Sequence, residues 1–504
     1  MQPNVAGARY ADIRETHAGV VVLIGEKAYK LKKPKDFGFL DYSTRELRLA
    51  ACLREVELNS RLAPDVYEGV LDVVDSTGRP FDHLIAMRRM PESRRLSTLV
   101  HGDRDLGGEL RAVARLLAAF HSRAPSGPEV REQGSTDALR GRWAASLHQI
   151  RPFRGEVLGG ETEEIERLAL RFVDGRQALF TARVDAGRVI DGHGDLLADD
   201  IFCLDDGPRI LDCLEFDDRL RWVDALDDAA FLAMDLERLG AAGAAEVFLR
   251  LYAEFTGDPA PASLHHHYVA YRALVRAKVA CLRHTQGDGS AGPQARLLEH
   301  IALGHLRDGA VRLVVVGGTP ATGKTTVAGG LADLLGAVLI SSDRVRKEQC
   351  GISPLASSAA AFGEGPYDAE TSRRVYTEIL ERAGLLLANG ESVVLDACWA
   401  DASWRQAAAM TAEDNAADFT QFRCTAPAAT VARRLAERPR DGCLSDADAA
   451  IERAVSSTFA PWPDATCVDT SHSVRAALEE MLAVARPSPP VAQWLPSRPL
   501  LTAD

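Results

Sequence analysis

A glycine-rich stretch in the second half of the chain, GGTPATGKTT at residues 317–326, restricts the possible folds more than any other feature. It follows a strand-like run, VRLVVV, and precedes a helical run, TVAGGLADLLG. Glycines permit a tight loop whose backbone N–H groups point inward, and the start of the following helix adds positive potential. The sequence therefore predicts a phosphate-binding loop between a strand and a helix.

This stretch matches the pattern G-x-x-x-x-G-K-[ST], with Lys324 and Thr325 as its last two positions. In such a loop the lysine reaches the β- and γ-phosphates of a nucleotide, and the hydroxyl that follows coordinates Mg²⁺. We therefore expect ATP and Mg²⁺ to bind here, with Thr325 as a metal ligand. The residues predicted to bind the nucleotide are Gly318, Thr319, Pro320, Ala321, Thr322, Gly323, Lys324, Thr325 and Thr326.

Short apolar runs alternate with helical stretches in the last third of the chain, among them VRLVVV, GAVLISSD, ESVVLDA and DFTQFRC. This alternation predicts a parallel sheet with helices on both faces. The second run leads into Asp343 and Arg346, and the third leads into Asp396 and Arg405. An arginine-rich stretch follows at 432–447. A lid over a transferring phosphate needs such residues, because a guanidinium group matches two phosphate oxygens at once.

In these features the chain resembles, over most of 311–485, the small P-loop kinases typified by gluconate kinase, polynucleotide kinase and zeta toxin. The resemblance implies that Asp343 accepts the proton of a substrate hydroxyl and that Asp396 holds Mg²⁺ through water. It also implies that Arg346 and Arg405 contact the substrate. The lid is expected to come from Arg433, Arg434, Arg438 or Arg440. Of these four, we predict that Arg433 and Arg438 bind the nucleotide.

A second unusual stretch, GHGDLLADDIFCLDDGPRILDCLEFDD at 192–218, contains nine carboxylates and a single arginine around two strand-like runs. A kinase of the protein-kinase type needs one aspartate to orient the attacking hydroxyl and further side chains to hold metal. Mg²⁺ prefers oxygen ligands, mostly carboxylates and phosphates. The order of Asp195, Asp200 and Asp212 matches that need, so the carboxylates are explained if they surround a metal nucleotide.

Here the chain resembles the aminoglycoside phosphotransferase family, whose mark is H-G-D-x-x-x-x-N followed by a strand ending in Asp. The match covers most of 20–280, and it is similar to bacterial proteins that join such a domain to a C-terminal P-loop kinase domain. The resemblance implies that Asp195 is the catalytic base and Asp212 the main Mg²⁺ ligand. It places Asp224 and Asp228 in a structural role behind the site.

One position departs from the family pattern, because Asp200 stands where the metal-binding Asn is expected. Aspartate can bind Mg²⁺, so we predict Asp200 as a metal ligand. The extra negative charge could instead change the number of metal ions, or mark a domain that binds nucleotide and transfers little.

The hairpin-like stretch 19–34 contains EKAYKLKK, in which Lys30 and Lys32 share one side of a strand because side chains alternate. Lys30 follows the Ala-x-Lys spacing of kinases, and we predict that it binds the nucleotide. It would pair with an acid on the next helix, Glu55, with Glu57 as the alternative.

The chain has 504 residues, which predicts two or three domains. We expect an α/β and α+β protein with a kinase domain of bilobal, protein-kinase-like fold at 1–300, a P-loop domain at 310–487, and a Pro-rich tail at 488–504. The net charge of -13 argues against a protein that coats nucleic acid without sequence preference, because such a protein needs a basic surface. Nine cysteines without CxxC spacing, no secretion signal and no membrane-length apolar run predict a reduced, cytoplasmic protein.

The combined expectation is an ATP- and Mg²⁺-dependent phosphotransferase that acts on a hydroxyl of a small molecule such as a sugar or an aminoglycoside-like compound. The acidic rim of the first domain favours a cationic acceptor such as an amino sugar. One alternative is a nucleotide-dependent regulatory protein in which one domain gates the other. Another is a sugar-nucleotide kinase of the zeta toxin type.

Overall fold

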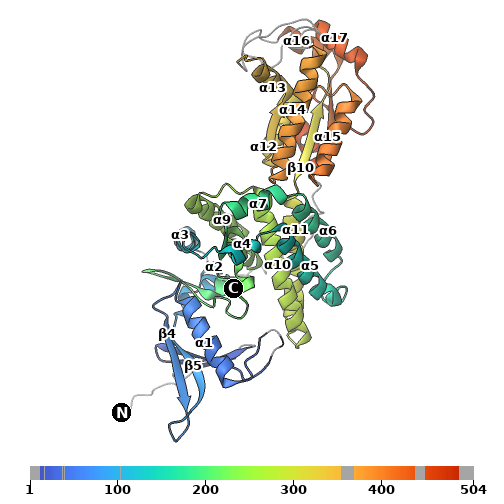
Figure 1. The fold of residues 1–504 in the computed structure, drawn as a ribbon. Helices are drawn as coiled ribbons and strands as arrows, with labels where there is room; N and C mark the ends of the chain where they lie inside the picture. The colour runs from blue at the N-terminus through green and yellow to red at the C-terminus, as the bar shows by residue number, and fades with distance from the viewer. Residues whose placement is uncertain are drawn as a thin grey trace, which may run out of the picture. The chain divides into compact units, whose positions relative to one another are not determined.

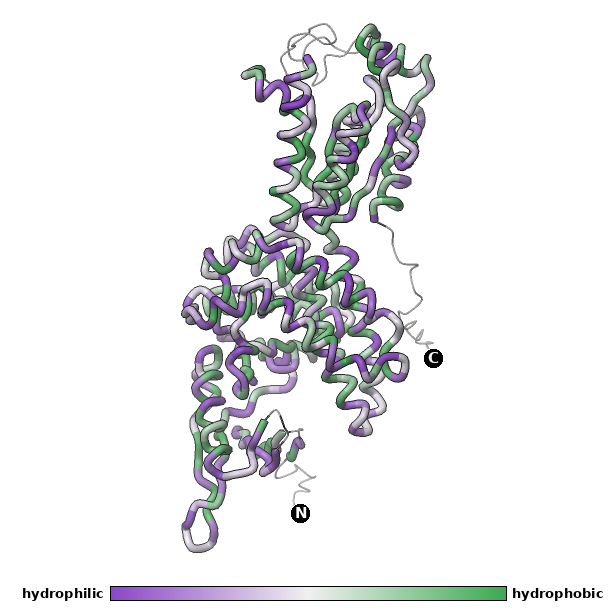
Figure 2. The backbone as a smooth tube through the Cα atoms, turned by 45° about the vertical axis from the view of Figure 1, so that its right-hand side comes forward, coloured by the Kyte–Doolittle hydropathy of each residue, from purple (hydrophilic) through white to green (hydrophobic). Residues whose placement is uncertain are grey.

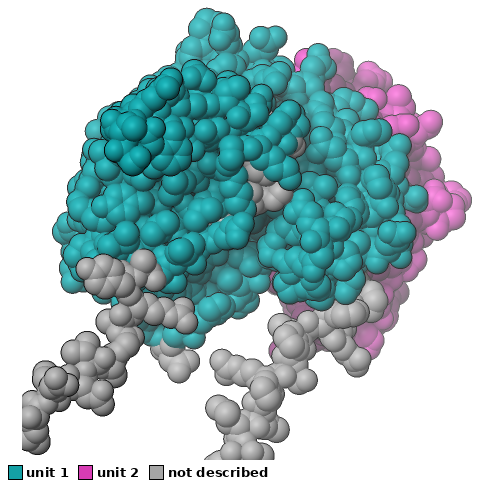
Figure 3. Space-filling view, turned by 90° about the horizontal axis from the view of Figure 1, so that it is seen from below, with its two compact units in different colours: residues 1–173, 180–260, 264–309 teal, residues 174–179, 261–263, 310–504 magenta. Residues whose placement is uncertain are grey.

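The structure is a computed structural model of the chain, and it describes residues 12–15, 18–36, 38, 40–102, 104–353, 368–437 and 449–486. Its backbone divides into two compact units, which Figure 3 shows in different colours. The first unit consists of residues 1–173, 180–260 and 264–309, and the second of residues 174–179, 261–263 and 310–504.

The first unit begins with a five-stranded antiparallel sheet in the order β1-β2-β3-β5-β4, of which Figure 1 labels β4 and β5. Its strands are β1 (Asp12–Glu15), β2 (Gly19–Ile24), β3 (Lys27–Lys32), β4 (Tyr67–Val74) and β5 (Pro80–Arg88). The helix α1 (Arg45–Asn59) connects β3 to β4 and packs against β4 and β5. It begins at Thr44, whose hydroxyl accepts a hydrogen bond from the backbone of Leu47. The expected hairpin at 19–34 is therefore β2 and β3.

The rest of the first unit is mostly helical, as the apolar periodicity predicts. Its helices are α2 (Leu96–Val100), α3 (Gly107–His121), α4 (Pro128–Glu132), α5 (Thr136–Ile150), α6 (Thr162–Asp174), α7 (Gln177–Asp185), α8 (Ala225–Arg238), α9 (Ala242–Thr256), α10 (Ala262–Thr285) and α11 (Ala291–Asp308). Between α7 and α8 the chain forms two small antiparallel pairs, which are β6 (Val189–Asp191) with β9 (Trp222–Asp224) and β7 (Ile201–Leu204) with β8 (Gly207–Ile210).

These two pairs carry the acidic stretch. The apolar residues of β7 and β8 are buried in the unit, including Phe202 and Ile210. The acidic residues lie at the strand ends and in the connecting turns, where the carboxylates can reach solvent or a ligand. A sheet this small has little core of its own, so its strands stay in place by packing on the neighbouring elements.

The second unit contains a five-stranded parallel sheet in the order β11-β12-β10-β13-β14. Its strands are β10 (Arg312–Gly317), β11 (Val338–Ser341), β12 (Val393–Asp396), β13 (Asp418–Thr425) and β14 (Thr466–Asp469). Its helices are α12 (Lys324–Leu335), α13 (Ser342–Gln349), α14 (Ala369–Ala388), α15 (Ala402–Asp414), α16 (Ala428–Ala436), α17 (Ala449–Thr458) and α18 (Val474–Ala485). All residues of β10 are buried, as a central parallel strand covered on both faces requires.

The register of this sheet brings the important strand ends together. Asp396 is paired with Val316 on one side and with Ser341 on the other. The carboxyl ends of parallel strands meet at one edge, which is where ligands bind in open α/β sheets. Figure 2 shows hydrophobic and hydrophilic residues mixed along the helices that cover both units. In the described part of the chain, no helix combines the length and the hydropathy that crossing a membrane requires.

The core of the first unit includes a histidine, His267 of α10, that is 2% exposed. The indole Nε1–H of Trp143 donates a hydrogen bond to its Nε2 at 3.0 Å, and the Phe172 ring stacks on it at 4.4 Å. Burial lowers the pKa of His267 to about 3. The imidazole is therefore neutral in the folded protein across the physiological range.

We expect this histidine to make the first unit less stable in acid. The unfolded chain takes up a proton below the ordinary pKa of 6.5, while the folded chain does so only near 3, so stability is lost as the pH falls through that window. Between pH 8 and pH 5 the loss amounts to about 2 kcal/mol. His267→Gln keeps an acceptor for Trp143 but does not titrate. In urea unfolding at the two pH values it should lose about 2 kcal/mol less than the parent; an equal loss in both proteins would contradict the assignment.

Candidate active sites

The phosphate-binding loop of the second unit has the backbone that its glycines predict. Gly318 and Gly323 have φ angles of 143° and 83°, and Ala321 has a φ of 63°. A Cβ atom on Gly318 would lie 2.6 Å from the carbonyl oxygen of Cys424, so only glycine fits there. The hydroxyl of Thr322 donates to the carbonyl of Thr319 at 2.7 Å and closes the loop. The predicted strand–loop–helix arrangement is present.

The buried carboxylate of Asp396 lies beside this loop. Burial raises its pKa, while the positive charge of Lys324 and a hydrogen bond with Thr325 oppose that shift. Its Oδ1 atom is buried and has no hydrogen-bond partner among the described residues. A buried carboxylate oxygen left open next to a lysine and a hydroxyl fits Mg²⁺, which keeps several waters and takes few protein ligands. The residues present therefore fit the metal predicted at Thr325 and Asp396.

Two further predicted residues come from α13 at the same edge of the sheet. Asp343 is half-buried in the first turn of α13, and its negative charge adds to the raised pKa of Asp396. Arg346 is buried one turn later, and its Nη1 is 3.4 Å from the hydroxyl of Ser372. The structure thus brings both residues to the carboxyl edge of the sheet, and their catalytic and substrate roles stay predictions.

Arg405 has a different environment. Its guanidinium donates to the backbone carbonyls of Trp399 at 3.2 Å, Ala460 at 3.3 Å and Pro461 at 2.8 Å. It also lies over the ring of Trp462. These contacts use most of its donors to join two loops, which is a structural task. Contact with a substrate stays a prediction for this residue.

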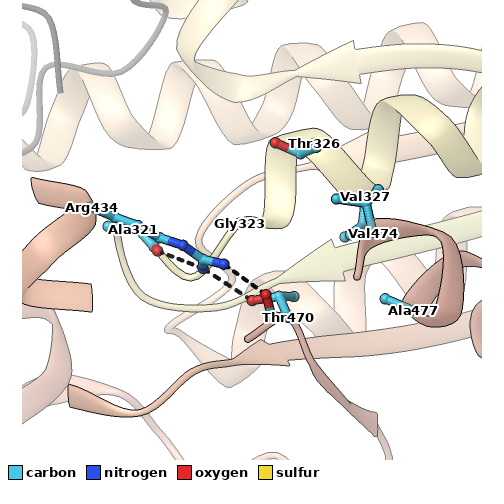
Figure 4. Close-up of a pocket in the computed structure, with 8 residues that line it drawn as sticks. All are labelled: Ala321, Gly323, Thr326, Val327, Arg434, Thr470, Val474 and Ala477. Carbon is cyan, nitrogen blue, oxygen red and sulfur yellow. Dashed lines mark hydrogen bonds between the residues drawn. The ribbon is translucent and has the colours of Figure 1, made fainter. Parts of the chain in front are cut away.

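An arginine of α16 reaches the phosphate-binding loop from the lid region. Figure 4 shows Arg434 beside a pocket of about 220 Å³, where its Nη1 donates to Ala321 at 3.3 Å and its Nη2 to Thr470 at 2.6 Å. The Thr470 hydroxyl in turn donates to the carbonyl of Thr322. Arg433 is exposed at the surface of the same helix. The remaining two candidates, Arg438 and Arg440, lie outside the described residues.

We expect Arg434→Ala to weaken ATP binding by the second unit about 10-fold, because it removes a cation and hydrogen bonds at the loop. Calorimetric titration of the Lys30→Ala variant, in which the first site is silenced, measures this effect. Arg475→Ala is the matched control and should change the affinity little, since this arginine of α18 has 89% of its side chain exposed. Equal losses in the two variants would contradict the assignment.

In the first unit, the predicted lysine pair is present on β3. The Nζ of Lys30 lies 2.8 Å from Glu55 Oε1 and 2.7 Å from Asp212 Oδ1. Glu57 instead contacts Arg54 on the exposed side of α1. Burial opposes the charged form of Lys30, but the two carboxylates outweigh it and raise its pKa well above the usual value. Lys30 is therefore a charged donor held between α1 and the acidic stretch.

Lys32 extends this arrangement into a network that the sequence alone did not reveal. Its Nζ is 2.5 Å from Glu55 Oε2 and 2.5 Å from Glu215 Oε1, and its side chain is 3% exposed. The hydroxyl of Tyr42 donates to Glu215 at 2.9 Å. Because both lysines hold Glu55, the position of α1 relative to the sheet is strongly determined. The sequence indicated this network only through the spacing of Lys30 and Lys32, which places both side chains on the same side of the strand.

The predicted base Asp195 and the two predicted metal ligands, Asp200 and Asp212, influence one another electrostatically. Burial raises the pKa of Asp200 well above its usual value, and the charges of Asp212 and Asp195 add to the shift. The positive charge of Lys30 lowers the pKa of Asp212. Within the described ranges, no three His, Cys, Asp or Glu side chains converge as metal ligands. A bound cation would nevertheless relieve the electrostatic repulsion between these clustered carboxylates. Asp200 and Asp212 therefore fit a role as Mg²⁺ ligands, and that role stays a prediction.

The loop that carries Asp195 is held from behind by α8. Asp228 accepts hydrogen bonds from the backbone N–H groups of His193 at 2.7 Å and Gly194 at 2.8 Å, and it contacts His121 Nε2 at 3.0 Å. Asp224 caps α8 and forms an ion pair with Arg183. Both contacts are of the structural kind that the resemblance implied.

A cavity of about 740 Å³ opens beside Lys30. The polar groups that line the cavity include Lys30, Asp200 and Asp212. Apolar side chains line much of the rest, among them Val21, Leu23, Ala28, Met87, Phe202, Leu204 and Leu211. Small-molecule sites commonly have this composition, with apolar walls for a flat ring and a few charged groups for orientation. The cavity therefore suits a nucleotide, with its base on the apolar walls and its phosphates at Lys30.

A P-loop at the carboxyl edge of a parallel sheet in the second unit, and a Lys–Glu–Asp cluster beside a cavity in the first unit, are the two candidate nucleotide sites of the protein. A family model described as an AAA domain matches residues 313–461. The chain belongs to the family of the uncharacterized protein Rv2004c of Mycobacterium tuberculosis, with 43% identity over 465 residues, 92% of this chain and 93% of the relative. The uncharacterized protein Mb2027c of Mycobacterium bovis matches equally.

Solved structures match parts of the chain at low identity. A choline/ethanolamine kinase family protein from Mesorhizobium loti is 13% identical, covers 60% of this chain and 94% of its own, and has a TM-score of 0.37. A GDP and kanamycin complex of APH(2")-IIia is 16% identical over 59% of this chain and 94% of its own, with a TM-score of 0.39. A sugar kinase from Janibacter is 20% identical over 34% of this chain and 93% of its own, with a TM-score of 0.26.

Proposed function

We propose that the protein uses ATP and Mg²⁺ to phosphorylate a hydroxyl of a small molecule, such as a sugar or an aminoglycoside-like compound. Both units would bind ATP, within domains at 1–300 and 310–487, and the predicted tail at 488–504 lies outside the described residues. The observation that carries the proposal is the contact of Lys30 with the buried Glu55 and with Asp212 at the wall of the large cavity. A cytoplasmic location, where ATP is available, belongs to the same proposal.

In the first unit each side chain has a distinct task. Lys30 binds and orients the phosphates, and Glu55 holds Lys30 in place. Asp195 accepts the proton of the acceptor hydroxyl as the new bond to phosphorus forms. Asp200 and Asp212 would hold Mg²⁺, which supplies charge neutralisation when bound. The protein contributes positioning and electrostatics and forms no covalent intermediate.

The second unit performs the same chemistry with a different set of groups. The amides of its phosphate-binding loop and Lys324 bind the phosphates, and Thr325 and Asp396 would hold Mg²⁺. Asp343 is the proposed base, at the sheet edge close to Asp396. Arg434 braces the loop from α16.

A second candidate function, nucleotide-dependent regulation of one unit by the other, is favoured by a single observation. Burial and two neighbouring acids raise the pKa of Asp200 well above normal, which favours the protonated form of this side chain when no cation is bound. A protonated Asp200 resembles the Asn of the family motif in shape. A first unit that binds nucleotide without using both carboxylates as metal ligands would be suited to sensing the nucleotide.

The two functions are separated by incubating the full chain with γ-labelled ATP and a metabolite extract. The proposal expects labelled products from the parent, a different product lost in each of the single variants Lys324→Ala and Asp195→Asn, and none from the double variant. If Lys324→Ala alone removes every product, the first unit is regulatory. If the parent labels no small molecule, the proposed function is wrong.

A further inference from the structure

Two arginines of α10, one helical turn apart, face the loop that carries Asp195. The guanidinium of Arg272 donates to both carboxylate oxygens of Asp227, at 2.7 Å and 2.9 Å, and is 4% exposed. Arg272 is therefore committed to the core. Arg276 lies on the same face of the helix, because residues four apart are neighbours. Its Nη1 is 3.5 Å from Oδ1 of Asp195.

The contact between Arg276 and Asp195 leaves most of the guanidinium available. A guanidinium carries five N–H donors in a planar fork, and one contact at 3.5 Å is longer than a good hydrogen bond. The side chains are partly open, with 21% of Arg276 and 35% of Asp195 exposed. A hydroxyl positioned for transfer lies about 3 Å from its base. The substituents of such an acceptor are therefore within reach of the Arg276 fork.

The charge around Asp195 also differs from the expectation drawn from the acidic stretch. Four acids of the acidic stretch form ion pairs with arginines: Asp205 with Arg94, Asp206 with Arg209, Asp217 with Arg219, and Asp218 with Arg221. Burial raises the pKa of Asp195, and the charge of Arg276 is the largest influence against that shift. A cation therefore lies 3.5 Å from the base, and the reason to expect a cationic acceptor is weakened.

We propose that the acceptor of the first unit is a hydroxyl compound bearing an oxyanion, a carboxylate or a phosphate, which binds to the guanidinium of Arg276. This inference rests on the proposed role of Asp195. In the reaction, the acceptor oxygen forms a bond to the γ-phosphorus while the bond to ADP breaks. The hydroxyl proton passes to Asp195 and ADP leaves. Arg276 takes no part in the bond changes and selects the acceptor, since a planar fork matches two oxygens of an oxyanion.

The test uses the full chain with Lys324→Ala, so that only the first unit transfers phosphate. Four acceptors of different charge are compared: a hydroxy acid, a sugar phosphate, a neutral sugar and kanamycin. Transfer to an oxyanion-bearing compound should have the lowest KM, and the hydroxy acid and sugar phosphate distinguish the two sources of the oxyanion. Arg276→Gln should raise that KM at least about 10-fold and leave the KM for ATP unchanged. Arg276→Lys should restore part of the affinity.

Lys278→Gln is the matched control, because it removes a cation from the same helix two residues further on, where the side chain points to a different face. It should leave the KM for the acceptor unchanged. Preference for the neutral sugar or kanamycin would overturn the inference. So would a loss in Arg276→Gln that lowers kcat equally for every acceptor, since the arginine would then act on the base or on ATP.

Failure of the proposed function has a different signature. In that case no acceptor would be phosphorylated, or Asp195→Asn would transfer as fast as its parent. Calorimetric titration of the sugar phosphate and the hydroxy acid in the presence of ADP tests the oxyanion site without any transfer. Binding of either compound that is lost in Arg276→Gln supports the inference, and the absence of heat with both compounds overturns it.

Discussion

Replacing Asp195 with asparagine is expected to lower phosphoryl transfer by the first unit by about 10²–10⁴-fold, the usual contribution of a positioned base. Asparagine keeps the shape and polarity of the side chain but cannot accept the hydroxyl proton. Burial raises the pKa of Asp195, so transfer by the parent should also fall in acid as this carboxylate takes up a proton. Transfer of label from ATP to an acceptor in the Lys324→Ala background measures both effects.

The matched control is Asp205→Asn, which makes the same change in the same acidic stretch. Asp205 lies in the turn between β7 and β8, with 96% of its side chain exposed. Its variant should transfer at the rate of the parent. If Asp195→Asn retains more than about one tenth of the parental rate, Asp195 is not the base. The affinity for ATP should change little, which separates the loss of a base from the loss of the nucleotide site.

Replacing Asp228 with alanine is expected to destabilise the first unit by about 3–5 kcal/mol and to abolish its transfer activity. The carboxylate is fully buried and serves the backbone N–H groups of His193 and Gly194 as well as the ring of His121. Alanine would leave these donors buried without partners. The same hydrogen bonds hold the loop of Asp195, so its geometry would be lost together with the stability.

Thermal unfolding and transfer assays on the Asp228→Ala chain check this result. The control is Asp185→Ala, which removes an exposed carboxylate at the end of α7 and should change stability by less than about 0.5 kcal/mol. A stable variant that is inactive would assign Asp228 to catalysis instead. A stable and active variant would show that the backbone of the loop needs no support from α8.

Several parts of both sites could be predicted because the responsible physics acts over a few neighbouring residues. The phosphate-binding loop needs glycine at Gly318, where a side chain would collide with the backbone, and such a requirement is visible in a short motif. The strand character of β3 places Lys30 and Lys32 on one side by simple alternation. The division into parallel and antiparallel regions followed from the spacing of apolar runs.

Other parts could not be predicted, since they depend on which helix face packs against the sheet. The sequence favours Glu55 and leaves Glu57 as an alternative partner of Lys30, and the packing of α1 turns Glu55 toward Lys30. In the same way, the orientation of α16 brings Arg434 to the loop and leaves Arg433 exposed. Arg405 carried a predicted substrate role, while in the fold its donors are taken by carbonyls.

The chain's local patterns were therefore sufficient to predict two nucleotide-type sites and the chemistry expected at each. They act through backbone conformation and side-chain alternation, which are properties of short segments. The tertiary structure alone decided two contacts, the one between Arg276 and Asp195 and the one between Lys32 and Glu55. These contacts join residues far apart in the sequence, and the packing of whole elements determines which charged groups come within reach of one another.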